Sequence, residues 1–125
     1  TIDIFCTEKE LKKATSRIVT DSTPMEEPKN PFTCNVYALA KLFLENDELL
    51  ALQARYAKGG EGYGHFKAYL NTLIWDYFAP AREKRAYYLE HKDEVMAILE
   101  EGANKARRIA SEKMRLIRDV VGIYR

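Results

Sequence analysis

The sequence predicts an all-α protein: a bundle of about five helices with one long, proline-kinked helix at its centre. Three observations support this prediction. Apolar residues recur at steps of three and four, which is the spacing of one helix face. Residues that start and stop helices separate these runs. Of the 125 residues, 46% are hydrophobic and 31% charged, which is typical of one soluble globular domain.

The longest run, residues 63–89, is the predicted central helix. Its apolar residues fall on one helix face: Phe66, Leu70, Leu73, Ile74, Tyr77, Phe78 and Ala81. Pro80 lies inside the run. A proline removes a backbone donor and clashes with the carbonyl four residues earlier, so we expect a kink between Asp76 and Pro80.

The first helix is predicted to follow Thr7, because Thr7 and Glu10 have the spacing of a capping box. Its inward residues would be Leu11, Ala14 and Ile18. The polar residues 20–23 and Pro24 would end it. Residues 25–33 are then expected to form an extended, exposed connector.

Two further helices are expected before the central one. Asn35 is a candidate N-cap for a helix that buries Val36, Leu39, Ala40 and Phe43. Asp47 is a candidate cap for residues 48–56, which Gly59 and Gly60 would end.

The last predicted helix covers residues 92–121. The middle of its inner face is small, with Gly102, Ala103, Ala106 and Ala110. Small residues allow a close approach, so we expect this face to pack against the aromatic central helix.

Charge does not identify a partner. The net charge is +1, although residues 102–125 carry 7 basic and 2 acidic residues. This mildly basic surface is compatible with a phosphate backbone, but a solvated helix face is the favoured interpretation. Cys6 and Cys34 have no metal-type spacing and are expected to be reduced thiols in a cytoplasmic protein. No run is long enough to predict a membrane span.

No arrangement of catalytic residues is recognisable. Carboxylates occur mostly one helical turn from basic residues, as Glu8 does from Lys12, and this spacing is ordinary helix support. We predict neither catalytic nor metal-binding residues. The spacing alone therefore predicts a helical binding or structural module.

Several stretches together resemble one family. They are IVTDSTP (18–24), CNVYALAKLF (34–43), RYAKGGEGYGHFKAYL (55–70), FAPAREKR (78–85) and EGANKARRIASEKMRLIRDVVG (101–122). Their order and spacing are similar to those of bacterial-type tryptophanyl-tRNA synthetase, a class I aminoacyl-tRNA synthetase. The stretches cover most of the chain.

The resemblance implies that residues 1–125 are a single helical anticodon-binding domain. The HIGH and KMSKS motifs of the nucleotide-binding part are absent from this sequence, and the chain begins with Thr1 rather than Met. We therefore expect a piece from the C-terminal side of a longer enzyme, inactive alone and without a cofactor of its own. The resemblance implies that the whole enzyme is a cytoplasmic homodimer that uses ATP with Mg to attach tryptophan to tryptophan tRNA.

The same resemblance places the first helix and the turn after it near the anticodon. The predicted RNA-binding residues are Lys13, Arg17, Thr20, Asp21 and Ser22. They offer the donors and acceptors that read unpaired bases. For Asp21 and Ser22, simple helix termination stays an open alternative.

Backbone phosphates are the expected partners of Arg82 and Arg85, and less strongly of basic residues on the last helix. That last group is Lys105, Arg107, Arg108, Arg115 and Arg118, which may instead pair with acidic neighbours or face the rest of an enzyme. A second hypothesis is a helical dimerisation or docking module with no RNA role of its own.

Overall fold

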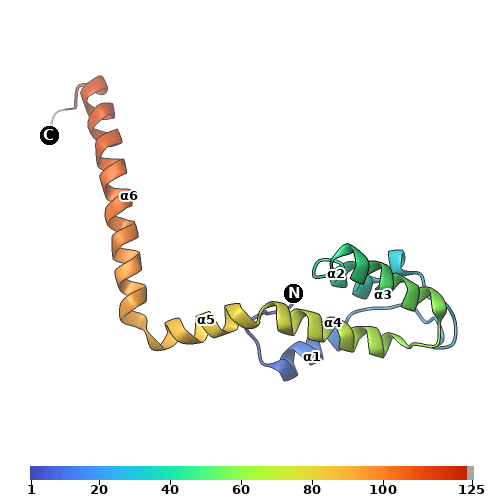
Figure 1. Ribbon diagram of the computed structural model, residues 1–125. Coiled ribbons are helices and arrows are strands. Elements are labelled where there is room, and N and C mark those ends of the chain that lie inside the picture. The colour runs from blue at the N-terminus through green and yellow to red at the C-terminus, as the bar shows by residue number, and fades with distance from the viewer. Residues whose placement is uncertain (124–125) are drawn as a thin grey trace. The chain divides into compact units, whose positions relative to one another are not determined.

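The computed structural model describes residues 1–123, and within them every regular element is helical (Figure 1). The elements are α1 (Glu8–Ser16), η1 (Pro31–Thr33), α2 (Asn35–Ala40), α3 (Asn46–Lys58), α4 (Tyr63–Tyr77), α5 (Ala79–Glu90) and α6 (Lys92–Val121). The all-α prediction is confirmed. The chain divides into two compact units, Thr1–Arg82 and a second that begins at Glu83.

The core of the first unit forms around α4. Phe66, Leu70 and Ile74 of α4 are buried, and α4 contacts both α1 and α2. The other helices contribute Leu11, Val36, Tyr37, Ala40, Leu52 and Tyr56. The rings of Tyr56 and Phe66 stack with centroids 3.9 Å apart. Each fully buried large side chain contributes about 1.5–3 kcal/mol, so these residues account for much of the unit's stability.

The predicted central helix is divided at Phe78. Phe78 has φ −93° and ψ 6°, and α5 starts at the next residue. Pro80 is the second residue of α5, where its missing N–H costs little because first-turn donors have no intrahelical partner. The expected kink is confirmed at this place, and it takes the form of a break between two helices.

Of the three N-cap residues predicted from the sequence, the structure confirms one. The Thr7–Glu10 capping box is present, with the Thr7 amide donating to Glu10 at 2.9 Å. The two other predicted caps are wrong. Cys34 precedes α2, and the side-chain NH₂ group of Asn35 instead donates to the Val19 carbonyl at 3.0 Å. Glu45 caps α3 through a capping box of its own, so Asp47 lies inside the helix.

The connector before α2 is mostly exposed, as expected, but Lys29 is an exception. Lys29 is only 3% exposed. Its ammonium donates to the carbonyls of Pro24, Met25 and Glu27 at 2.9, 3.1 and 3.0 Å. These bonds satisfy an otherwise costly buried charge, so the lysine holds the loop in one conformation.

The second unit contains most of α5 and all described residues of α6. Tyr87 stacks on His91 and donates its hydroxyl to Glu94 at 2.8 Å, which links the two helices. The expected burial of the last helix's inner face is wrong, because no described residue of α6 is buried. Leu99 and Ile117, for example, are 60% and 51% exposed. None of the described helices is both long enough and apolar enough to cross a bilayer.

Candidate nucleic-acid interface

The end of α1 presents two cations on one side. Lys13 and Arg17 lie four residues apart, so they share a helix face, and both are exposed. The backbone N–H of Arg17 donates to the Ala14 carbonyl at 3.2 Å and ends the helix there. Positive charge at this end also complements the helix dipole. Neither cation forms an ion pair with another residue in the described part of the chain, so both are available to bind an anionic backbone.

The segment after α1 is extended and held at both ends. Asn35 fixes the Val19 carbonyl, and Asp21 Oδ1 accepts a hydrogen bond from the Thr23 amide at 2.9 Å. Thr20 is half-buried, while Asp21 and Ser22 are exposed. Since α1 stops at Ser16, these residues lie beyond the helix rather than closing it.

The Asp21 carboxylate is kept ionised by its surroundings. Hydrogen bonds from Thr23 lower its pKa most, with smaller contributions from Tyr63 and Lys29. Burial raises the pKa of Tyr63 to about 12, and the Asp21 carboxylate adds to that rise. The Tyr63 hydroxyl is buried and makes no hydrogen bond of ordinary geometry with a described residue. An ionised, oriented carboxylate can accept hydrogen bonds from the N–H groups of unpaired bases.

Arg82 contacts Trp75 of α4 rather than the segment 13–22. Its guanidinium carbon is 3.7 Å from the centre of the Trp75 ring, and the group donates a hydrogen bond to the Trp75 carbonyl. Arg82 is half-buried and closes the first unit, whereas Arg85 is exposed in the second. The predicted phosphate contacts of both residues stay predictions.

The basic residues of α6 are all exposed. Arg107 donates to Asn104 at 2.9 Å on the same helix. The other exposed candidates for phosphate contact on α6 are Lys105, Arg108, Arg115 and Arg118, and Lys92 and Lys113 are exposed as well. The five leading candidates, by contrast, come from one continuous segment, 13–22.

Two residues behind this segment were not singled out from the sequence. Tyr63 and Lys29 help to lower the pKa of Asp21, yet Tyr63 is the first residue of α4, next to a glycine-rich turn, and Lys29 lies in a proline-rich loop. Neither a helix end beside glycines nor a proline-rich loop has a periodicity that would predict where a side chain points. For Lys29, the only signal in the sequence is a single lysine between Pro28 and Asn30, and such a lysine by itself predicts a solvent-exposed side chain.

Comparison with known proteins gives a consistent result. No family profile matches the chain. The tryptophan–tRNA ligase of Campylobacter jejuni is 54% identical over 98% of the chain, and that of Fusobacterium nucleatum is 44% identical. The chain spans 39% and 38% of the length of these two relatives.

Solved structures agree. A crystal structure of tryptophanyl-tRNA synthetase from Campylobacter jejuni is 55% identical, with a TM-score of 0.90 over 98% of this chain and 38% of that one. A second structure of that protein, complexed with ADP and tryptophan, gives a TM-score of 0.92.

The helical fold and these matches define the class: the chain is homologous to aminoacyl-tRNA synthetases. Within that class, it is a homologue of part of the tryptophan–tRNA ligases, as the sequence motifs predicted.

Proposed function

We propose that this chain is the tRNA-binding helical part of a tryptophan–tRNA ligase and that it binds the anticodon loop of tryptophan tRNA. The observation that carries the proposal is the 54% identity to such a ligase over 98% of the chain. The exposed cations at the end of α1 and the ionised Asp21 in the segment that follows supply the matching chemistry.

The rest of the ligase would carry out the chemistry. It would use ATP with Mg to form tryptophanyl-adenylate and would then charge the tRNA. The Campylobacter protein that was solved with ADP and tryptophan supports this division, because this chain corresponds to 38% of it. The proposal includes a homodimeric, cytoplasmic whole enzyme in which residues 1–125 have no activity alone.

The test is a fluorescence anisotropy titration of the 125-residue chain with the tryptophan anticodon stem-loop. The same hairpin with its three anticodon bases changed is titrated in parallel, and both are run at low and moderate salt. Circular dichroism first verifies that the chain is helical. We expect a preference for the native loop that persists as salt is added, because base contacts depend less on salt than phosphate contacts do.

Single substitutions test which residues cause the preference for the native hairpin. Asp21→Asn keeps the shape but removes the charge, so it should reduce the preference between the two hairpins. Arg17→Gln should weaken binding to both hairpins. Lys41→Gln, an exposed lysine of the same unit, is the matched control. Equal and steeply salt-dependent binding of the two hairpins would contradict anticodon reading.

A docking or dimerisation module is the second candidate function. The exposed apolar residues of α6 favour it, including Leu99, Met114 and Ile117. Apolar surface of this kind often marks an interaction site. Light scattering during size-exclusion chromatography should then show self-association that rises with concentration. A monomer at every concentration would argue against self-association through α6.

A further inference from the structure

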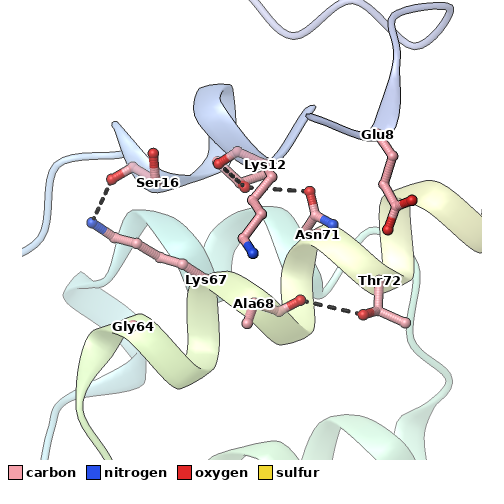
Figure 2. Close-up of a pocket in the computed structure, with 9 residues that line it drawn as sticks. Glu8, Lys12, Ser16, Gly64, Lys67, Ala68, Asn71 and Thr72 are labelled. Carbon is pink, nitrogen blue, oxygen red and sulfur yellow. Dashed lines mark hydrogen bonds between the residues drawn. The ribbon is translucent and has the colours of Figure 1, made fainter. Parts of the chain in front are cut away.

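A groove between α1 and α4 is lined by more positive than negative side chains. It has a volume of about 320 Å³ and is lined by Lys12 and Ser16 on α1 and by Lys67 and Asn71 on α4, among others (Figure 2). Glu8 is the only acidic residue among the described residues that line it. Two lysines against one carboxylate make the groove attractive to an anion.

The two lysines are held differently. Lys67 Nζ donates to the Ser16 carbonyl at 3.0 Å, which places its ammonium beside the last turn of α1. An ammonium has three donors, so two remain for a ligand. Lys12 lies one turn before Ser16 and reaches from α1 toward α4 (Figure 2). Its ammonium makes no hydrogen bond or ion pair with any described residue.

The remaining wall adds donors and leaves room. Asn71 Oδ1 lies 3.5 Å from Thr15 Oγ1, and the NH₂ group of Asn71 makes no hydrogen bond with a described residue. At Gly64, a Cβ atom would meet nothing within 4 Å, so the groove is open there. The groove therefore offers several donors to a group with several acceptor oxygens, which is the pattern of a phosphate.

We propose that this groove binds a backbone phosphate of the RNA. The proposal rests on the proposed function and extends it to a second face of α1. Lys12 and Lys13 are adjacent, so they point to different sides of the helix. An RNA strand that crosses the end of α1 can place one phosphate near Lys13 and Arg17 and another in the groove.

The experiment measures the salt dependence of stem-loop binding by the 125-residue chain. The variants are Lys12→Gln, Lys12→Arg and Glu8→Gln. Lys9→Gln is the matched control, because Lys9 is an exposed lysine of α1 that does not line the groove. Circular dichroism verifies each fold. Lys12→Gln should lower the slope of log K against log salt by about 0.7, the value for one phosphate contact on a single strand.

The other variants fix the interpretation. Lys12→Arg should keep the slope, and Glu8→Gln should raise the affinity because a repelling charge is removed. A Lys12→Gln slope equal to that of Lys9→Gln would overturn the groove proposal. That result leaves the proposed function intact as long as the wild-type chain still prefers the native anticodon hairpin.

A second readout separates RNA from a free anion. Nitrogen-15 NMR follows the Gly64 amide and the Asn71 side chain during titration with inorganic phosphate and with the stem-loop. Shifts at lower concentration with the stem-loop support the proposal. Shifts that occur only with inorganic phosphate would overturn the groove proposal. That conclusion holds whether or not the chain prefers the native anticodon hairpin.

Discussion

The backbone N–H of Lys29 donates to the carbonyl of Tyr56 at 2.8 Å, which fastens the loop before α2 to the last turn of α3. The side chain of the same lysine closes that loop on itself. The Lys29 ammonium bonds three loop carbonyls and lies 5.6 Å from the centre of the Tyr63 ring.

Lys29→Met should therefore destabilise the first unit. The methionine fills the space but leaves three carbonyls without their donor, and a buried group that loses a charged partner costs on the order of 2–4 kcal/mol. Urea denaturation followed by Trp75 fluorescence measures the change. Lys58→Met, at an exposed lysine of α3, is the control. Equal effects of the two changes would contradict the role of the Lys29 bonds.

Gly59 and Gly60 provide a matched pair. Both have positive φ, 70° and 82°, so alanine strains either position by about 1–3 kcal/mol. A Cβ at Gly59 would also lie 2.5 Å from the Glu26 carbonyl oxygen, whereas one at Gly60 meets nothing within 4 Å. Gly59→Ala should thus lower the free energy of unfolding more than Gly60→Ala does. Similar losses would mean that the loop moves aside.

The Arg55–Glu61 pair should make stability depend on pH. Arg55 Nη2 is 2.6 Å from Glu61 Oε2, and Nε is 3.0 Å from Oε1. The hydrogen bonds from Arg55 lower the pKa of Glu61 below its usual 4.5. The pair therefore stabilises the fold fully above pH 4.5, and this contribution is lost as the pH falls through the lowered pKa.

Glu61→Gln should remove that acid-side loss. Since both side chains are about one-third exposed, the effect at neutral pH should be no more than about 1 kcal/mol. Denaturation midpoints at pH 7 and pH 3 measure it, with Glu26→Gln as the control for losing a carboxylate. The role of the pair would be refuted if Glu61→Gln and the wild-type chain lost equal stability on acidification.

The contact between Arg82 and Trp75 is directly observable. Trp75 is the only tryptophan of the chain, so its fluorescence reports this site alone. Arg82→Gln removes a cation 3.7 Å from the ring centre. We expect a changed emission spectrum and a loss of about 0.5–2 kcal/mol in stability. Lys84→Gln, a charge change on the same helix, should leave the spectrum unaltered.

Periodicity predicted the helices well and their ends poorly. Phe66, Leu70 and Ile74 are buried as their spacing required. The Thr7–Glu10 box was found because both of its members have strong local preferences. Glu45 was missed as a cap because glutamate is not a typical N-cap residue, and Asn35 was misplaced because its side chain bonds Val19 instead.

The sequence could propose only those candidate residues that lie close together in the chain. Lys13, Arg17 and Asp21 lie on one short segment, so the resemblance was sufficient to select them. Lys67 and Lys12 are 55 positions apart, and only the packing of α4 on α1 places both on one groove. No spacing rule along a single helix finds such a pair.

The exposure of α6 has a consequence for local unfolding. Its 30 residues form a helix without one buried side chain among those described, so its hydrogen bonds gain little from tertiary packing. Opening a few of its turns would expose almost no additional apolar surface. Its amide hydrogens should therefore exchange with solvent far sooner than those of α4, and added protease should cut the chain within α6 while residues 1–82 still resist.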